Sequence, residues 1–400
     1  MIKKIIKSYD YSLIIAIALL CAFGLVMVYS SSMAWAVSPR YGVEADHFYQ
    51  KQKLFMLGSL VFFLLTALFP YKIMKSTKFL LPMVFLSVLG LLGLLIFGKI
   101  AGNAQSWYQI GPLKLQPSEF VKLCVIIYLA AVYAKKQTYI NQFNQGVLPP
   151  LAYLIIVCSF IAMEPDYGTA IIIALIGATI IFSSGMNIKN IIKLILIGAI
   201  IILPFILVFQ DKIFTEKRMG RVTAVSDPFA DVQKTGFQLA NSYIAIGSGG
   251  VNGLGLGKSV QKLGYLPESH TDFIMAIIAE ELGMWGVGFV ILTLTYIVLR
   301  GLYIGLRCKD PFGSLLAIGV SSMIGIQAFI NLGGVSGIIP LTGVPLPFIS
   351  YGGSSLLMLA ISAGILVNIS MFVKYENKYK NKQEKINKKV QHRNGKVFYI

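Results

Sequence analysis

Long apolar stretches separated by short polar segments dominate the chain. A bilayer core of about 30 Å is crossed by about 20 apolar residues in a helix, and ten stretches approach or exceed this length. They lie at residues 11–33, 52–70, 79–98, 117–134, 148–163, 167–184, 189–209, 273–299, 314–333 and 352–373. This pattern predicts an all-α polytopic membrane protein, with a single ten-helix transmembrane domain over residues 1–373.

Two polar regions stand out from the short connectors. Residues 210–271, between the seventh and eighth stretches, are predicted to form one large loop. Residues 374–400 are polar, rich in lysine and almost without apolar periodicity. That composition predicts a disordered basic tail that lies near anionic lipid.

The basic residues give the orientation of the spans. The chain is 56% hydrophobic and only 13% charged, with a net charge of +18. Lys and Arg are enriched in cytoplasmic loops, and one side of the predicted bundle holds most of them: Lys3, Lys4, Lys7, Lys72, Lys75, Lys78, Lys135, Lys136, Lys189, Lys193, Arg300, Arg307, Lys309 and the tail. The short loops of the other side hold Arg40, Lys51, Lys53, Lys99 and Lys114. Both termini are therefore predicted to be cytoplasmic, and the large loop to be outside.

Several classes of protein are disfavoured by the same residues. The charges form clusters between apolar runs, without the basic, aromatic-interleaved stripe of a nucleic-acid surface, so no nucleic-acid partner is expected. The four cysteines lie in apolar runs or a short loop, which indicates no disulfide framework. The three histidines make no zinc-type cluster, so the sequence predicts no metal cage and no organic cofactor.

Polar, glycine-rich and proline-rich motifs gather in four segments on the predicted outer side. They are residues 102–119, the turn 164–169, the large loop with its closing motif 266–273, and residues 337–355. Outer loops of this composition are more than simple connectors. Any chemistry of the protein is therefore expected at the outer face.

Glu119 and Lys122 lie three residues apart at the outer end of a span. This spacing places them on one helical face, close enough to pair. A charge inside the bilayer costs about 2.5–3.5 kcal/mol on insertion scales, so such pairs usually face a cavity or the bundle interior. A structural ion pair and a functional pair remain equally open from the residues alone.

The large loop carries groups suited to phosphate. Arg218 and Arg221 lie near its start, and Lys258 follows a glycine-dense run over residues 247–257. Glycine-rich backbone can present N–H groups to an anion while a nearby lysine or arginine supplies charge. Flexible turns are the commoner explanation of such a run.

Asp272 follows a proline-started turn and opens a span, near the outer boundary of the membrane. Aspartate is a leading N-cap residue, so a helix cap is the favoured interpretation from the residues alone. Glu280 and Glu281 lie about 12 Å deeper along the same helix. Adjacent carboxylates point in different directions on a helix, and we expect one of them to pair with a basic residue across the bundle.

Four motifs together resemble the bacterial SEDS family (shape, elongation, division and sporulation proteins). They are Gln116-Pro117-Ser118-Glu119 with Lys122, Leu266-Pro267-Glu268-Ser269-His270-Thr271-Asp272-Phe273, Glu280-Glu281-Leu282-Gly283, and Pro345-Leu346-Pro347-Phe348-Ile349-Ser350-Tyr351-Gly352-Gly353-Ser354. The opening Tyr9-Asp10-Tyr11 and the run 25–32 resemble the division branch, which leaves the elongation and sporulation branches as alternatives. Many members carry a basic pair where this chain has Gln105 and Ser106.

The resemblance implies a peptidoglycan glycosyltransferase that polymerises lipid II, an undecaprenyl-diphosphate disaccharide-peptide, at the outer face of the cytoplasmic membrane during division. It implies that catalysis depends on Asp272, as general base of an inverting displacement, and that Glu119–Lys122 is a functional pair. The candidates for contacts with the substrate or its phosphates are Arg218, Arg221, Lys258, Glu268, His270, Ser350, Gly352 and Gly353. A divalent cation (Mg²⁺ or Mn²⁺) is expected to assist the diphosphate, and a class B penicillin-binding protein transpeptidase and other divisome membrane proteins are the expected partners.

Two other classes of function compete with this interpretation. A lipid II flippase would also have ten spans, intramembrane charges and glycine-interrupted or proline-interrupted helices. However, no corresponding pair of broken helices marks inverted halves, and the polar motifs concentrate at the outer face. A non-catalytic scaffold would explain the spans but not the clustered outer carboxylates.

Overall fold

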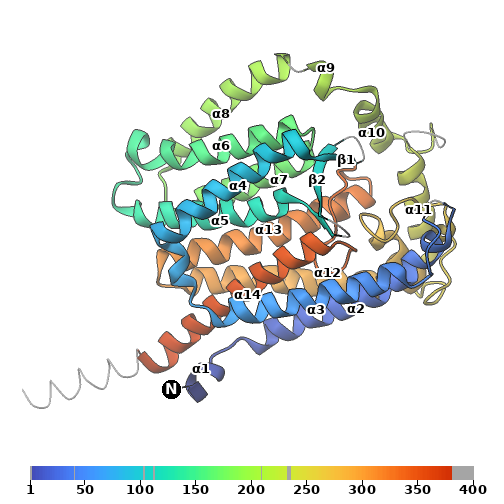
Figure 1. The fold of residues 1–400 in the computed structure, drawn as a ribbon, viewed down its shortest axis with the longest axis horizontal. Helices are drawn as coiled ribbons and strands as arrows, with labels where there is room; N and C mark the ends of the chain where they lie inside the picture. The colour runs from blue at the N-terminus through green and yellow to red at the C-terminus, as the bar shows by residue number, and fades with distance from the viewer. Residues whose placement is uncertain are drawn as a thin grey trace, which may run out of the picture.

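Ten apolar helices run along the long axis of the computed structural model (Figure 1). The structure describes residues 2–39, 41–101, 104–110, 113–208, 210–231 and 236–380. Within them the ten helices are α2 (Tyr11–Val37), α3 (His47–Leu68), α4 (Thr77–Phe97), α5 (Pro117–Lys135), α6 (Leu148–Met163), α7 (Tyr167–Ser183), α8 (Ile188–Val208), α12 (Ile274–Arg307), α13 (Pro311–Val335) and α14 (Gly353–Tyr375). Seven of them are long and apolar enough to cross a membrane, while α6 and α7 are shorter, with 16 and 17 residues. The predicted polytopic all-α fold is confirmed.

Shorter elements fill the connectors. They are α1 (Ile2–Ile6), η1 (Tyr71–Lys75), η2 (Gln137–Tyr139), η3 (Phe143–Val147), α9 (Gln210–Ile213), α10 (Glu216–Ser226), α11 (Phe237–Gly249), η4 (Gln261–Leu263) and η5 (Glu376–Lys380). Residues 210–271 are therefore not one plain loop, because α9, α10, α11 and η4 lie within them. Arg40, Gly102, Asn103 and the tail after Lys380 lie outside the described residues.

A small antiparallel sheet interrupts the helices between α4 and α5, which the apolar pattern did not predict. Its strands are β1 (Lys99–Ala101), β2 (Ala104–Ile110) and β3 (Leu113–Leu115), in the order β1-β2-β3. The Tyr108 hydroxyl donates to the Gly90 carbonyl at 2.8 Å, which ties β2 to α4. Proline at the first position then starts α5, where the missing N–H costs no hydrogen bond.

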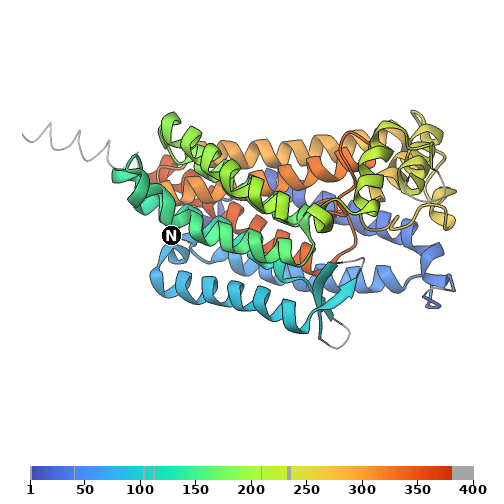
Figure 2. The ribbon, with the colours of Figure 1, turned by 90° about the horizontal axis from the view of Figure 1, so that it is seen from above.

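The core lies among α5, α13 and α14, whose most apolar windows are at least 72% buried. In contrast, α3 and α4 present leucines and phenylalanines outward, among them Leu57, Leu64 and Phe85. Figure 2 shows α4 at the periphery of the bundle, and α8 lies at its edge in Figure 1. An apolar outer surface of this kind suits contact with lipid chains.

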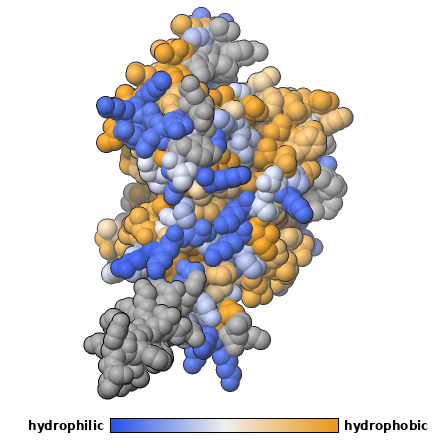
Figure 3. Space-filling model, turned by 90° about the vertical axis from the view of Figure 1, so that its left-hand side faces the viewer, coloured by the Kyte–Doolittle hydropathy of each residue, from blue (hydrophilic) through white to orange (hydrophobic). Residues whose placement is uncertain are grey.

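The two ends of the bundle carry different elements. The N-terminus and the end of α14 lie at one end, whereas the small sheet, α10 and α11 lie at the other (Figure 1). At the first end hydrophilic side chains form a band between hydrophobic flanks (Figure 3). In this end the buried Asp10 carboxylate contacts Arg300 Nη2 at 2.8 Å and Lys374 Nζ at 3.3 Å. These contacts join the start of α2 to α12 and α14.

Candidate active site

The four outer segments found in the sequence converge in the structure. The turn before α7 meets the segment before α14, where Gly168 faces Thr342. Ser354 joins the sheet to α14, because its hydroxyl donates to the Lys114 carbonyl at 3.0 Å and accepts from the Gln116 N–H at 3.3 Å. The closing motif of the large loop binds the same segment through Ser350. Segments that the sequence placed only on the same side are therefore in contact with one another in the structure.

Hydrogen bonds to three consecutive carbonyls hold the backbone at Asp272. The carbonyl of His270 accepts from the Tyr351 N–H at 2.9 Å, and that of Thr271 accepts from the Ser350 hydroxyl at 2.6 Å. The carbonyl of Asp272 itself accepts from Asn331 Nδ2 at 2.7 Å. Each donor comes from the end of α13 or the segment before α14, so both elements fix the position of the Asp272 side chain.

The helix-cap interpretation of Asp272 is wrong. The residue at the N-cap of α12 is Phe273, and no side chain caps that terminus. Asp272 lies one residue earlier and is partly buried. A Cβ at Gly343, where φ is +75°, would come within 3.5 Å of Asp272 Oδ2, so this glycine lets the backbone before α14 pass close to the carboxylate.

The environment of Asp272 favours its protonated form more than water does. Burial and, next in size, the nearby Glu268 carboxylate raise its pKa to about 6, against the opposing effects of Thr271 and the Arg221 charge. A carboxyl with a pKa near 6 is ionised at pH 7 but is a stronger base than an ordinary aspartate. This is the property that a general base requires.

Helix α10 brings two arginines to the same region. Arg218 donates to the Pro165 carbonyl at 3.3 Å and lies over the Tyr167 ring, 4.5 Å from its centroid. Arg221 donates to the Leu341 carbonyl at 3.2 Å, near enough to Asp272 for their charges to interact. The sequence marked both arginines as phosphate candidates, and of the two it is Arg221 that places positive charge near the Asp272 carboxylate.

Glu119 and Lys122 form the ion pair that their spacing predicted. Lys122 Nζ lies 2.7 Å from Glu119 Oε1, and both side chains are buried. The pair acts electrostatically on Asp166, whose pKa burial raises in spite of two hydrogen bonds from Thr169. Its place beside the converging segments fits both a scaffold and a functional role.

Glu164 is an acidic group that sequence analysis did not single out. It is 1% exposed, and neither carboxylate oxygen has a hydrogen-bond partner among the described residues. Burial, together with the Asp166 charge, raises its pKa to about 8, so this carboxyl is largely protonated at pH 7. Its position in a proline-containing polar turn was visible in the sequence, but its burial was not.

Two other residues predicted to contact the substrate are His270 and Lys258, and neither is placed beside the Asp272 carboxylate as a phosphate ligand. The His270 ring is buried between Phe48 and Tyr351, at centroid distances of 4.7 and 5.6 Å, and burial lowers its pKa to about 4. A neutral, enclosed imidazole argues against a phosphate contact. Lys258 is exposed over Gly255, and no contact within the described part of the chain links it to Asp272.

The remaining candidates shape the segment before α14 and the closing motif. Ser350 bonds two backbone groups, Thr271 O and Leu346 N. The Gly352 N–H donates to Gln52 Oε1 at 3.3 Å, and Gly353 packs against the Phe55 ring. Glu268 Oε2 accepts from Thr271 Oγ1 at 2.9 Å, beside Asp272. Of these four residues only Glu268 is a charged neighbour of the carboxylate, so it remains a candidate for a direct role.

Two features complete the description of the site. Asn331 lies inside the apolar α13, where no motif marked it, yet its amide joins Asp272 to Val344 by donating to both carbonyls. Within the described ranges no three His, Cys, Asp or Glu side chains are placed to hold a metal ion. The backbone of Gln105 and Ser106 lies in β2.

Comparisons with known proteins agree with this arrangement. The family described as "Cell cycle protein", which comprises FtsW, RodA and SpoVE, matches residues 11–375. The chain is 58% identical to the "Probable peptidoglycan glycosyltransferase FtsW" of Bacillus subtilis, over 96% of each chain. It is 38% identical to the "Stage V sporulation protein E" of the same organism, over 92% of this chain and 98% of the relative.

Two solved structures share the fold. One, described as "Structural coordination of polymerization and crosslinking by a peptidoglycan synthase complex", has a TM-score of 0.71 at 23% identity and covers 91% of this chain and 98% of its own. The other is the rod shape determining protein RodA of Thermus thermophilus, with a TM-score of 0.64 at 22% identity over 93% of this chain and 98% of its own. At these identities the likeness concerns the fold.

Proposed function

The chain belongs to the FtsW/RodA/SpoVE family, and on this basis we propose that it is a peptidoglycan glycosyltransferase that polymerises lipid II during cell division. The observation that carries the proposal is Asp272, whose backbone is held by hydrogen bonds to three consecutive carbonyls and whose carboxylate lies near the Arg221 charge. The 58% identity to a relative named "Probable peptidoglycan glycosyltransferase FtsW", against 38% to the sporulation protein, supports the division branch.

The proposed reaction is a single inverting displacement. The acceptor sugar's 4-hydroxyl oxygen attacks the anomeric carbon of the donor while Asp272 takes the hydroxyl proton. The bond from that carbon to the diphosphate oxygen breaks, and the lipid diphosphate leaves with the bonding electrons. Because a diphosphate needs no protonation to leave, one base is enough, and a positioned base contributes about 10²–10⁴-fold.

Positive charge on α10 assists the departing diphosphate. Arg218 and Arg221 both belong to α10, and each donates to a backbone carbonyl of the converging outer segments. Their guanidinium charges are suited to bind phosphate oxygens and to stabilise the negative charge that develops on them. Lys258, exposed on the same outer loop, is the weaker candidate for this role.

The expected divalent cation stays a prediction. The described residues offer no group of three potential ligands for it, so a resident protein-held ion does not fit them. In the proposed reaction the positive charge beside the diphosphate comes from Arg218 and Arg221, with Lys258 as the weaker candidate.

The protein is a multi-pass membrane protein, and we assign its site to the outer face of the cytoplasmic membrane with both termini inside. The distribution of basic residues and the opposite placement of the termini and the outer segments support this orientation (Figure 1). The proposed partner is a class B penicillin-binding protein transpeptidase. This is supported by the fold shared with the peptidoglycan synthase complex that coordinates polymerization and crosslinking. Other divisome membrane proteins are proposed as further partners.

The decisive experiment is polymerisation of lipid II by the purified protein in vesicles, with and without the transpeptidase. Glycan chains that depend on the protein, and a higher yield with the partner, would support both proposals. Movement of labelled lipid II across the bilayer without any polymer would instead identify a flippase. Equal polymerisation with and without the partner would remove activation, but not the enzyme.

A further inference from the structure

Helix α12 is interrupted at Gly283, about three helical turns after Asp272. Gly283 has φ +60° and ψ −151°, a conformation outside the helix, which separates residues 274–282 from the longer inner part. The loop after α11 binds the C-terminal end of this short segment. The N–H groups of Leu254 and Gly255 donate to the carbonyls of Glu280 and Glu281, both at 2.9 Å. The short segment and the loop therefore form one unit.

Glu280 binds backbone in the same unit. Its carboxylate accepts from the Val260 N–H at 2.9 Å, from the Gln261 N–H at 3.4 Å and from the Ser259 hydroxyl. These donors start residues 259–273, which we call the Asp272 loop. Glu280 thus holds the first residues of the loop through a hydroxyl and backbone N–H groups.

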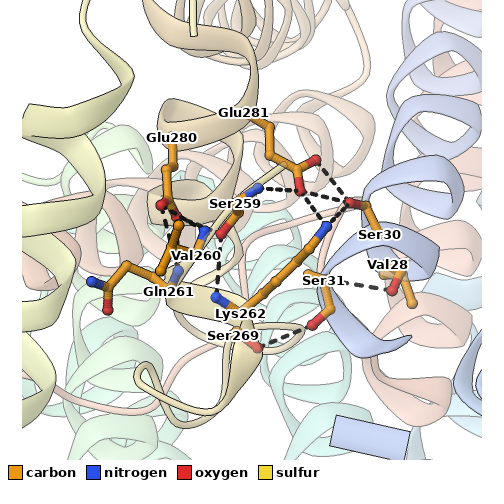
Figure 4. Close-up of polar contacts among 10 residues, drawn as sticks. All are labelled: Val28, Ser30, Ser31, Ser259, Val260, Gln261, Lys262, Ser269, Glu280 and Glu281. Atoms are coloured by element: carbon orange, nitrogen blue, oxygen red, sulfur yellow. Dashed lines mark hydrogen bonds and ion pairs between the residues drawn. The ribbon is translucent and has the colours of Figure 1, made fainter. Parts of the chain in front are cut away.

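Glu281 forms a buried ion pair with Lys262. Among the described residues of the outer region, the other buried ion pair is Glu119–Lys122. Lys262 Nζ lies 2.7 Å from Glu281 Oε1 and 3.0 Å from Ser30 Oγ, and Ser30 Oγ donates to both Glu281 oxygens at 2.7 and 2.8 Å (Figure 4). Lys262 is 4% exposed and Glu281 is 0% exposed. The expectation that one of the two glutamates pairs with a basic residue is confirmed for Glu281, but its partner Lys262 lies in the Asp272 loop and not on a span across the bundle.

These contacts attach the loop to α2 as well as to α12. Ser30 belongs to α2, and the neighbouring Ser31 carbonyl accepts from Ser269 Oγ at 3.1 Å. Lys262 lies ten positions before Asp272 and Ser269 three positions before it. The loop is therefore held near its start by Lys262 and near its end by Ser269, the Ser350–Thr271 contact and Asn331.

We propose that Lys262, paired with Glu281 and Ser30, is a positioning residue that fixes the Asp272 loop against α2 and α12 and so places the Asp272 carboxylate at the reacting centre. The inference rests on the proposed function. The free-energy cost of desolvating two charges can equal or exceed the gain from their attraction. Replacing a buried ion pair by neutral groups therefore often leaves the folding stability unchanged or increases it. Stability alone therefore accounts poorly for a lysine at this position, whereas a fixed loop geometry accounts for it.

The test uses a double variant, Lys262→Met with Glu281→Gln, which leaves no unmatched charge. The matched control is Lys72→Met with Glu376→Gln, which removes an ion pair of 4.0 Å at the other end of the bundle. For each full-length protein in detergent we would measure the melting temperature, amide exchange over residues 259–273, and kcat and KM for lipid II against pH. Ser30→Ala, which removes the shared hydroxyl without changing charge, serves if the double variant does not fold.

We expect the double variant to melt within a few degrees of the native protein while amide exchange in the Asp272 loop rises about tenfold or more. We expect kcat to fall about 10- to 100-fold with little change in KM, because misplacement of about 1 Å can cost about 10²-fold. The acid limb of the kcat profile should also move below pH 6, since a loosened loop admits water to Asp272. The control pair should leave exchange, kcat and the limb unchanged.

Native kcat in the well-folded double variant would overturn the positioning role, and unchanged loop exchange would overturn the holding role. A fall in kcat that only follows a lower melting temperature would reduce Lys262 to a structural residue. If the native protein makes no glycan, the proposed function fails by itself. The exchange measurement still decides whether Lys262 holds the loop.

Discussion

Two aspartates at opposite ends of the bundle have opposite surroundings. Asp10 lies at the end of the bundle that we propose to be cytoplasmic, which we call the inner end. There Arg300, Lys374 and the Ser12 hydroxyl all contact its carboxylate. Burial acts to raise its pKa, but the hydrogen bonds from Ser12 and Arg300 and the two positive charges outweigh burial and lower it. Asp272 lies at the outer end, where burial and Glu268 dominate and raise the pKa to about 6.

The difference separates a carboxylate that stabilises the fold from one that is available for chemistry. Every contact of Asp10 favours its charged form, so its ionisation contributes to folding. The Asp272 backbone is tied at its carbonyl, while its carboxylate keeps a raised affinity for a proton. At the outer end the hydrogen bonds thus fix the backbone position of Asp272, while its carboxylate remains able to accept a proton.

The largest effect expected from this contrast is that of Asp272→Asn on activity. The amide has nearly the same size but cannot take a proton, so polymerisation of lipid II should fall by at least about 10²-fold. Removing a carboxylate whose ionisation opposes folding should at the same time leave the protein as stable as before, or more stable by about 1–2 kcal/mol at pH 8. Glycan yield and thermal unfolding of the same preparation measure both.

Polymerisation by the Asp272→Asn variant at the native rate would contradict the assignment of Asp272 as the reactive carboxylate. The base would then have to be sought among Glu268, Asp227 and Asp231. Lipid II binding is the control, and we expect it to change far less than the rate, because the phosphate contacts are assigned to arginines.

The second effect concerns the Glu119–Lys122 pair, which resembles Asp10 in its contacts but lies at the outer end. Changing either residue to Ala leaves a buried charge unmatched, which costs about 3–5 kcal/mol. Glu119→Lys combined with Lys122→Glu should recover part of the stability that either reversal loses. Strictly additive losses would mean that the two charges act separately.

Activity in that exchanged pair decides its role. Stability regained together with the native rate would make the pair a scaffold, as Arg300 is for Asp10. Stability regained without activity would show that the site requires this particular placement of the two charges.

The pH dependence gives the third and smaller effect. Only ionised Asp272 accepts a proton, so kcat/KM should rise with pH and reach half its maximum near pH 6, falling about tenfold per unit below it. An acid limb near pH 4, the ordinary range of an aspartate, would contradict the raised pKa. Initial rates between pH 4.5 and 8 at saturating and limiting lipid II would separate the limb of kcat from that of kcat/KM.

The smallest effect on activity is expected for Asp10→Asn. Its folded pKa is lowered, so its stabilisation is complete above the unfolded value near pH 4 and is lost as the pH falls through the folded value. At pH 7 the variant should lose about 1–2 kcal/mol, since its partners are partly exposed. The rate of the folded fraction should stay within about threefold of the native one, and a larger loss would connect the inner end to catalysis.

Much of the fold followed from the apolar pattern, because lipid demands nearly continuous apolar stretches that a sequence displays directly. The sheet between α4 and α5 did not, because its strands of three to seven residues lie in polar sequence. Helix α11 was also missed, since the glycines that follow it suggested a flexible loop.

The site was predicted unevenly for a similar reason. Motifs marked Asp272, Arg218, Arg221 and the Glu119–Lys122 pair, although the residues alone favoured a helix cap for Asp272. Asn331 and Lys262 were missed, because a lone amide in an apolar span and a lone lysine in a long loop carry no pattern. Their roles arise from contacts between residues 59 and 232 positions apart, which only the folded chain displays.

The interruption of α12 at Gly283 has a mechanical consequence. A continuous helix tilts as a rod when the bilayer becomes thinner or thicker. Here the outer segment 274–282 ends at Gly283, and its last carbonyls bind the loop after α11 in place of the next helical turn. The inner part of α12 can therefore adjust its tilt to membranes of different thickness without transmitting that tilt to the outer segment. The enzyme is expected to keep its working geometry in lipids of widely different chain length.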